Sequence, residues 1–262
     1  MDADEENPKV DFEVGSKINN WVILELLDEG GCGKVFKVNE IDKKENEFAM
    51  KIESSSIEGG SAIKMESEIL DKLGKFEHFP FKVHAGKREK FQYIVMELLG
   101  DSLRVLHGTA EYNVEWFIQN VRLRSPDPLS FSTSTWSRLA VQCLCAIKKL
   151  HDHGYVHRDI KPGNFALGNP GCKDLLRARI VFLLDFGMAR PYATLCTRRN
   201  IMIVRRPRPA RVGMFRGTAR YCSPNTHENK ELGRIDDVWS LLYLIIEFIR
   251  PLPWAEKNEL DE

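Results

Sequence analysis

The stretch His157-Arg158-Asp159-Ile160-Lys161-Pro162-Gly163-Asn164, followed downstream by Asp185-Phe186-Gly187, decides the fold. An apolar run from Ile180 to Leu184 leads directly into the second motif. Transfer of a phosphoryl group needs an acceptor for the proton of the attacking hydroxyl, and it needs oxygen ligands for Mg²⁺. The two motifs supply both at this spacing, and the alternative is a pair of unrelated polar loops.

Each polar residue of these motifs has an expected role. Asp159 orients the substrate hydroxyl and accepts its proton, and Lys161 neutralises charge on the transferred phosphoryl group. Asn164 and Asp185 hold Mg²⁺. The sequence therefore predicts a phosphoryl-transfer site that uses a divalent cation.

A glycine-rich turn lies upstream, in the stretch Asp28-Glu29-Gly30-Gly31-Cys32-Gly33-Lys34-Val35. Its three glycines let backbone N–H groups approach phosphate oxygens without interference from a Cβ atom, although a tight hairpin turn is the alternative. Lys51 follows on the next strand and Glu66 on the next helix. A Lys that contacts phosphates needs a carboxylate to fix its flexible head, so the order of these residues favours a nucleotide site over two solvated surface charges.

The first hundred residues have a strand-like pattern with one helical interruption. Short apolar runs predict strands at Trp21–Leu24, Val35–Val38, Phe48–Ile52 and Tyr93–Met96. Apolar residues at helical spacing predict one helix over Ile63–Leu73. We expect a small sheet that carries one helix.

The chain after residue 100 has a helical pattern. Trp136–Leu150 predicts an amphipathic helix behind a Ser/Thr-rich start, and Asp236–Ile249 is apolar on nearly every face, which predicts a helix buried all round. Thr109–Ser132 and Thr197–Ala210 have mixed charge and Pro, so they are expected to be surface insertions or long loops. Within the second of these, Ile201–Val204 is a strand former without an obvious burial site.

The formal net charge is zero, but it is a cancellation of opposed blocks. Residues 1–13 carry six acids and one Lys, for a charge of −5, and residues 228–262 carry four bases and nine acids, again −5. Residues 186–227 contain nine Arg and no Asp, Glu or Lys. This balance excludes a globally cationic binder of nucleic acid or membrane surfaces. With no secretory signal and no apolar stretch long enough for a bilayer, we expect the chain in the cytosol or the nucleus.

The motifs together resemble a eukaryotic protein kinase domain, and Asp159-x-Lys161-Pro162 is similar to the Ser/Thr-specific form. The matching motifs extend from Trp21 to Trp254. Four stretches resemble the casein kinase I group, and its tau-tubulin kinase branch in particular: Met96–Gly100, His157–Phe165, Phe215–Tyr221 and Asp236–Leu241.

This resemblance implies an α+β, two-lobed fold with ATP between the lobes. An acidic extension would cover residues 1–20 and the kinase domain residues 21–262, with an antiparallel-sheet N-lobe at about 21–99 and a mainly helical C-lobe at about 100–262. The implied adenine-site residues are the gatekeeper Met96, the hinge Glu97, Leu98 and Leu99, and the covering side chains Val35 and Ala49. In the same way, Thr218 would contact Asp159 and Lys161, and Asp237 would brace the loop.

The Arg-rich segment then coincides with the region that receives the protein substrate. Guanidinium groups there favour proteins with acidic or already phosphorylated Ser/Thr sites, and the family is similarly known for such substrates. A solvated insertion is the alternative for Arg198–Arg208. A nucleic-acid contact is disfavoured because no aromatic residues are interleaved with the arginines, and we predict no membrane partner. The oligomeric state is left open.

Three departures from the family pattern support a rival prediction. Asp28 stands at the first glycine position of the loop, insertions lengthen two connections, and family domains continue beyond Trp254 whereas this sequence stops at Glu262. We therefore expect a C-lobe truncated after its central helix, with an exposed apolar patch on that helix. The rival is a catalytically weak, pseudokinase-like binding or scaffold module.

Overall fold

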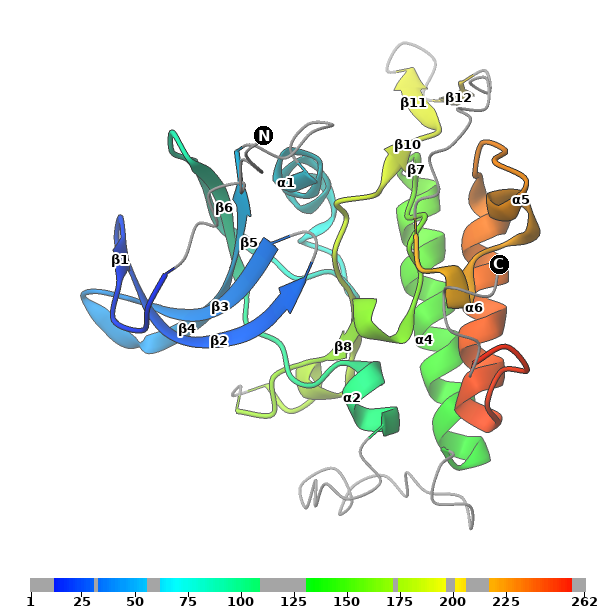
Figure 1. Ribbon diagram of the computed structural model, residues 1–262, viewed down its shortest axis with the longest axis horizontal. Coiled ribbons are helices and arrows are strands. Elements are labelled where there is room, and N and C mark those ends of the chain that lie inside the picture. The colour runs from blue at the N-terminus through cyan, green and yellow to red at the C-terminus, as the bar shows by residue number, and fades with distance from the viewer. Residues whose placement is uncertain are drawn as a thin grey trace, which may run out of the picture. The chain divides into compact units, whose positions relative to one another are not determined.

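The computed structural model describes residues 12–30, 33–55, 62–108, 131–171, 174–196, 201–205 and 217–255. The chain divides into two units, Met1–Leu99 and Gly100–Glu262 (Figure 1). The first is built on a curled antiparallel sheet and the second is mainly helical. This is the two-lobed α+β fold that the sequence predicts.

The first unit consists of one sheet and one helix. Its elements are β1 (Lys17–Ile18), β2 (Trp21–Gly30), β3 (Gly33–Glu40), β4 (Lys43–Ser54), α1 (Ala62–Leu73), β5 (Lys82–Lys87) and β6 (Phe91–Glu97). The strands pair antiparallel in the order β1-β2-β3-β4-β6-β5. All four predicted strands are confirmed, whereas β1 and β5 were not predicted because neither contains an apolar run.

Apolar packing holds this sheet and its helix together. The core of the sheet includes Trp21, Val38 and Met50, all buried. On α1 the buried residues are Ile63, Glu66, Ile69, Leu70 and Leu73, which is the helical spacing visible in the sequence. The helix presents that face to the sheet unit, so its position is set by burial of four apolar side chains and one carboxylate.

The second unit combines helices with short strand pairs. Its elements are α2 (Leu103–Gly108), α4 (Thr133–Asp152), β7 (Tyr155–Val156), η1 (Pro162–Asn164), β8 (Phe165–Leu167), η2 (Arg177–Arg179), β9 (Val181–Leu183), β10 (Arg190–Pro191), β11 (Ala193–Cys196), β12 (Ile201–Val204), η3 (Ala219–Tyr221), α5 (Pro224–His227) and α6 (Arg234–Ile249). The pairs β7/β10, β8/β9 and β11/β12 are antiparallel. The predicted helix over Trp136–Leu150 is confirmed as α4.

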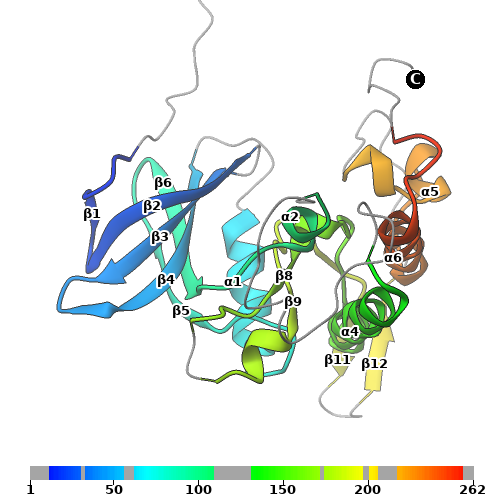
Figure 2. The ribbon, with the colours of Figure 1, turned by 90° about the horizontal axis from the view of Figure 1, so that it is seen from below.

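Helices α4 and α6 lie side by side, and Figure 2 shows them nearly end-on. The Ser132 side chain caps α4 by accepting a hydrogen bond from the backbone N–H of Thr135 at 3.3 Å, which satisfies one free donor of the first turn. At the start of α6, the Asp236 carboxylate accepts from the backbone N–H of Gly233 at 2.6 Å. A polar side chain therefore accepts a hydrogen bond from a backbone N–H at the start of each helix.

The prediction that α6 is buried all round is wrong. Leu241, Leu244 and Phe248 are buried, but Ile235 is 58% exposed and Leu242 is 44% exposed. Within the described residues, α4 and η3 pack against one side of α6, so the other face keeps contact with solvent. The expected exposed apolar patch on this helix is thus present.

The expected loop at Thr197–Ala210 contains regular structure. Ile201–Val204 forms β12 and pairs with β11, with Ala193 opposite Val204 and Cys196 opposite Ile201. A β-branched run needs a partner strand for its backbone groups, and β11 supplies one. Of the other insertion, Thr109–Ser132, residues 109–130 lie outside the described residues. In the described part of the chain, no helix combines the length and hydropathy that a membrane span needs.

Candidate active site

Lys51 and Glu66 form a buried ion pair in the first unit. The Nζ atom of Lys51 lies 2.9 Å from Oε2 of Glu66, and the two side chains are 8% and 2% exposed. Strand β4 positions the Lys and the buried face of α1 positions the Glu. Because an unpaired buried charge is costly, each side chain fixes the other, and this is the pairing that the sequence predicts.

Sequence reasoning missed a second contact between β4 and α1. The carboxylate of Glu53, which is 3% exposed, accepts a hydrogen bond from the backbone N–H of Ile63 at 3.2 Å. A carboxylate at a helix N-terminus satisfies a free donor and complements the helix dipole. Glu53 lies two residues after Lys51, so both side chains leave β4 on the same face and hold the same helix.

The glycine-rich turn joins β2 to β3. Gly30 and Gly33 face each other across the hairpin, whereas Gly31 lies outside the described residues. A Cβ atom at Gly33 would lie 2.1 Å from the carbonyl oxygen of Ile52, and its φ of +115° disfavours any other residue. A Cβ atom at Gly30 would meet no atom within 4 Å. Packing therefore requires the glycine at 33 but not the one at 30, and space at position 30 suits close approach of a ligand.

The expected adenine-site residues lie on neighbouring strands. Val35 of β3 is opposite Lys51 of β4, and Ala49 of β4 is opposite Met96 of β6. Glu97 ends β6, and the backbone N–H of Glu97 bonds to the carbonyl of Phe81 at 3.0 Å. The remaining two, Leu98 and Leu99, follow β6 without regular secondary structure.

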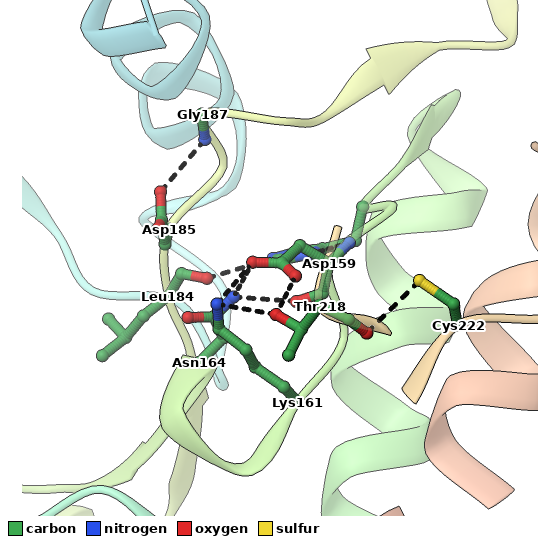
Figure 3. Close-up of polar contacts among 9 residues, drawn as sticks. Asp159, Lys161, Asn164, Leu184, Asp185, Gly187, Thr218 and Cys222 are labelled. Atoms are coloured by element: carbon green, nitrogen blue, oxygen red, sulfur yellow. Dashed lines mark hydrogen bonds and ion pairs between the residues drawn. The ribbon is translucent and has the colours of Figure 1, made fainter. Parts of the chain in front are cut away.

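Asp159 is the centre of a closed polar network in the second unit (Figure 3). Its Oδ2 atom lies 2.8 Å from Nζ of Lys161, and its Oδ1 atom accepts from the hydroxyl of Thr218 at 2.9 Å. Nζ of Lys161 in turn donates to the Thr218 hydroxyl at 3.1 Å. Asp159, its neighbour Lys161 and the distant Thr218 therefore fix one another's side chains, and the Asp159 carboxylate is oriented from both of its oxygens.

Asn164 and Asp185 lie beside this network. The amide nitrogen of Asn164 donates to the backbone carbonyl and to Oδ2 of Asp159, at 2.7 and 3.1 Å. The amide oxygen of Asn164 takes part in neither bond. Asp185 follows β9, and its carboxylate accepts from the backbone N–H of Gly187 at 3.3 Å. Their oxygen atoms are the type of ligand that Mg²⁺ prefers, so the two residues fit a divalent cation. Within the described residues, no group of three or more His, Cys, Asp or Glu side chains is arranged to hold a metal ion.

Asp237 of α6 braces the loop that contains Asp159, as the sequence resemblance implies. Its carboxylate accepts from the backbone N–H groups of His157 and Arg158, each at 2.8 Å, and Nε2 of His151 lies 2.8 Å from it. Asp237 is 1% exposed. Arg158 has a positive φ of 71°, an unfavourable conformation for a residue with a Cβ atom. These backbone contacts hold the peptide before Asp159 in that conformation.

His157 links the two motifs, which sequence reasoning missed. Its Nε2 atom lies 3.0 Å from the carbonyl oxygen of Leu184, and its ring lies 5.5 Å from the ring of Phe186 in an edge-to-face arrangement. Both His157 and Phe186 are fully buried. The first residue of one motif and the second residue of the other are therefore in contact, a relation that sequence spacing alone does not reveal.

Two arginines of the Arg-rich segment, residues 186–227, lie beside acids that come from outside that segment. Nη2 of Arg220 lies 2.5 Å from Glu247, and Nη1 of Arg190 lies 3.7 Å from Glu231. Both acids come from the acidic C-terminal block. These two arginines are therefore already paired with acids. The remaining arginines other than Arg205 lie outside the described residues.

Comparison with known proteins places the chain in a family. The protein kinase domain matches residues 21–262, so the chain belongs to the protein kinase family. The relatives that it resembles include proteins named as a tau-tubulin kinase and as a casein kinase I.

Three relatives from Caenorhabditis elegans illustrate the match. One, provisionally named a serine/threonine-protein kinase, is 37% identical over 98% of this chain and 67% of its own length. Another, named an inactive tau-tubulin kinase, is 43% identical over 72% of this chain and 61% of its own length. A third, provisionally named a casein kinase I, is 33% identical over 94% of this chain and 64% of its own length. The chain spans about two thirds of these relatives.

Proposed function

We propose that this protein is an ATP- and Mg²⁺-dependent kinase that phosphorylates Ser and Thr residues of other proteins. The observation that carries the proposal is the closed network of Asp159, Lys161 and Thr218. When bound, ATP would supply the γ-phosphoryl group and Mg²⁺ would neutralise its charge.

The second unit would hold the acceptor hydroxyl and the metal. The Asp159 carboxylate, oriented by Thr218 and Lys161, accepts the proton of the substrate hydroxyl. Lys161 adds positive charge beside the same site, and its contact with Asp159 keeps that charge in place. Asn164 and Asp185 hold the metal through side-chain oxygens.

The first unit would hold the nucleotide. Lys51, fixed by Glu66, binds the α- and β-phosphates, and the glycine-rich turn presents backbone N–H groups to them. Gly30 suits the turn to phosphate binding. A Cβ atom at this position would meet no atom within 4 Å, so packing does not require a glycine there. Met96 lies beside the adenine as gatekeeper, Val35 and Ala49 cover the ring, and Glu97, Leu98 and Leu99 form the hinge that pairs with it.

We further propose that the substrates are proteins whose Ser or Thr is flanked by acidic or already phosphorylated residues. Nine Arg and no acid in residues 186–227 support this preference. Arg220 already pairs with Glu247 and is left unchanged in the test. Arg211 and Arg216 are therefore the arginines to test.

The substrate preference can be measured with matched peptides that carry either a phosphoserine or a serine near the acceptor site. Replacement of Arg211 and Arg216 by Gln should reduce the ratio of kcat/KM for primed over unprimed peptide at least about tenfold, the loss of one or two charge-assisted contacts. The control replaces two exposed arginines elsewhere, Arg88 and Arg138, by Gln. An unchanged ratio in the Arg211/Arg216 variant contradicts the preference.

The rival function is a pseudokinase-like binding module. Asp28 in the glycine-rich turn favours it, because a carboxylate near the phosphates weakens ATP binding, and one relative is named inactive. Incorporation of the γ-phosphate of ATP into casein separates the two functions. A catalyst labels many equivalents of casein per equivalent of protein, whereas a binding module binds nucleotide without labelling. For either function we propose that the protein acts in the cytosol or the nucleus.

A further inference from the structure

The hairpin formed by β11 and β12 carries apolar side chains that the described residues leave uncovered. Leu195 of β11 is 50% exposed, and Ile203 and Val204 of β12 are 53% and 62% exposed. Successive residues of a strand point to opposite faces, so Ile203 and Val204 make both faces of β12 apolar. Figure 1 shows the hairpin beyond the C-terminal end of α4. Neighbouring exposed apolar side chains are typical of an interaction surface.

The base of the hairpin is fixed to the end of α4 and to the turn that follows it. The backbone N–H of Tyr192 donates to the carbonyl of Gly154 at 2.8 Å, and its hydroxyl donates to the carbonyl of His151 at 2.7 Å. A Cβ atom at Gly154 would lie 2.6 Å from the carbonyl oxygen of Ala193 and 2.7 Å from Cε of Met202, so the hairpin packs directly on this glycine. Because its base is held at several points, the hairpin offers a preformed surface that a partner does not have to order.

The outer edge of β12 has backbone groups directed away from β11. The backbone N–H of Arg205 donates to the carbonyl of Tyr192 at 2.8 Å, and Val204 lies opposite Ala193. Bonded and non-bonded positions alternate in an antiparallel pair, so the N–H and C=O groups of Met202 and Val204 point outward. Among the described residues, no strand other than β11 pairs with β12. This edge is therefore a template for one further strand.

The two faces of the hairpin differ in chemistry. Leu195 and Val204 share one face, and both are apolar. Thr194, Ile203 and Arg205 share the other face, where Nε and Nη2 of Arg205 each lie 3.4 Å from the hydroxyl of Thr194. Side chains of adjacent strands contact each other on one face of a sheet. An added strand therefore needs apolar side chains on the first face and an acidic side chain beside Arg205 on the second.

Charge and backbone bonding decide which partner suits this edge. Residues 186–227 contain nine Arg and no acid, so pairing with a second copy would bring two strongly cationic segments together. A membrane is disfavoured as well, because the N–H and C=O groups of an open strand edge are costly to place in hydrocarbon. An acidic extended segment of another protein satisfies both the charge and the backbone groups.

We propose that the outer edge of β12 is a docking site for a partner protein, which adds an extended segment of alternating apolar and acidic residues as a third strand. The apolar side chains contact Leu195 and Val204, and an acidic side chain pairs with Arg205. Backbone groups of the segment bond to Met202 and Val204. The site contains none of the residues that contact Asp159, so docking does not depend on the proposed kinase function.

The test measures binding of a fluorescent, end-capped peptide, Glu-Ile-Glu-Val-Glu-Val-Glu, to the full chain by anisotropy. The peptide has no Ser, Thr or Tyr, so it is not a substrate for phosphate transfer. We expect saturable binding with a Kd below about 1 mM, and at least about tenfold weaker binding of the same peptide with Lys in place of Glu. Absence of saturable binding, or equal binding of the two peptides, would overturn the proposal.

Two substitutions at one position test the strand edge itself. Val204→Pro removes an outward N–H but leaves the bonds between β11 and β12, so the Kd of the acidic peptide should rise at least about tenfold. Val204→Thr keeps that N–H and the β-branched shape, so the Kd should stay within about twofold. An equal Kd for Val204→Pro and the unsubstituted protein contradicts strand addition.

Arg205→Glu keeps the test conclusive if Val204→Pro disturbs the hairpin. It reverses the charge beside the edge, so the acidic peptide should bind at least about tenfold more weakly and the Lys peptide more tightly. The matched control is Arg138→Glu on an exposed position of α4, which should change neither Kd. If Arg205→Glu leaves the preference for the acidic peptide unchanged, the proposal is wrong.

The two disfavoured occupants are tested with the same variant. We expect neither the sedimentation coefficient nor the binding to phosphatidylserine vesicles to differ between the unsubstituted protein and Val204→Pro. Self-association that Val204→Pro abolishes would assign the edge to a second copy, and vesicle binding that it abolishes would assign the edge to a membrane. Either result would overturn the proposal.

Discussion

In the first unit, Lys51 and Glu66 join a strand to a helix through one buried ion pair, whereas in the second unit Asp159 lies in a loop and is held by at least three side chains. The first arrangement takes its precision from regular secondary structure. The second takes it from many polar contacts, because its backbone has no helix or strand to define it. A single substitution in the first site should therefore leave a buried charge without its counter-ion. In the second site it should leave the Asp159 carboxylate misoriented.

The largest expected effect is on the stability of the first unit. Glu66→Ala leaves Lys51 buried without its counter-charge, so we expect the free energy of unfolding to fall by about 3–5 kcal/mol in urea titrations. Glu68→Ala, on the exposed side of the same helix, should change it by less than about 0.5 kcal/mol.

A double variant tests whether the loss of the ion pair causes this instability. Lys51→Met combined with Glu66→Leu removes both charges and fills the space with apolar atoms, so most of the lost stability should return, although phosphate transfer would not. If the double variant is as unstable as Glu66→Ala alone, the ion pair is not the cause of the loss.

A smaller effect is expected at the glycine-rich turn, where two glycines allow a matched comparison. Gly33→Ala must adopt a strained φ and displace the carbonyl of Ile52, which should cost about 1–3 kcal/mol and raise KM for ATP. Gly30→Ala has open space around its Cβ atom, so stability should hold while KM for ATP rises. Equal loss of stability in the two variants contradicts the different reasons given for the two glycines.

The smallest effect concerns pH in the second unit. Within the part of the chain that the structure describes, Nε2 of His107 is buried without a hydrogen-bond partner, and its ring packs against Phe131 and Phe248. Burial lowers the pKa of His107, so its contribution to stability is present above its ordinary pKa of about 6.5 and is lost as the pH falls. The residue is partly exposed, so the effect should stay below about 1.4 kcal/mol.

Unfolding measurements at pH 7.5 and pH 5 test this point. From pH 7.5 to pH 5, the free energy of unfolding should fall more for the unsubstituted protein than for His107→Gln. The reason is that His107 is protonated in the unfolded chain at pH 5, whereas the folded protein keeps it neutral. The same loss in both proteins would show that His107 does not titrate with folding.

Helical periodicity and motif order predicted much of the first unit. All five residues of the expected α1 face are buried, and the spacing of Lys51 and Glu66 behind a glycine-rich turn identified an ion pair that the structure contains. Short-range patterns succeed here because each element buries one continuous face. Glu53 was missed because an acid near a strand end gives no sequence signal that it caps a helix.

The second unit was less predictable because its contacts join distant loops. The contacts of Thr218 and Asp237 were expected only from family resemblance, and the pairing of Glu247 with η3 was not expected at all. One signal was available, because Glu247 interrupts an otherwise apolar stretch, and a buried acid requires a partner. An exposed apolar patch on α6 was expected, but the residues that form it could not be predicted, since composition does not say which neighbours pack against a helix.

The proposed transfer of phosphate to a protein hydroxyl depends on Asp159. The most direct measurement compares kcat of the unsubstituted protein and of Asp159→Asn for casein phosphorylation, at saturating ATP and Mg²⁺. Asn keeps the shape of the side chain but cannot accept the proton, so we predict a fall of about 10²- to 10⁴-fold with little change in KM for ATP. Equal kcat in the two proteins would contradict the account.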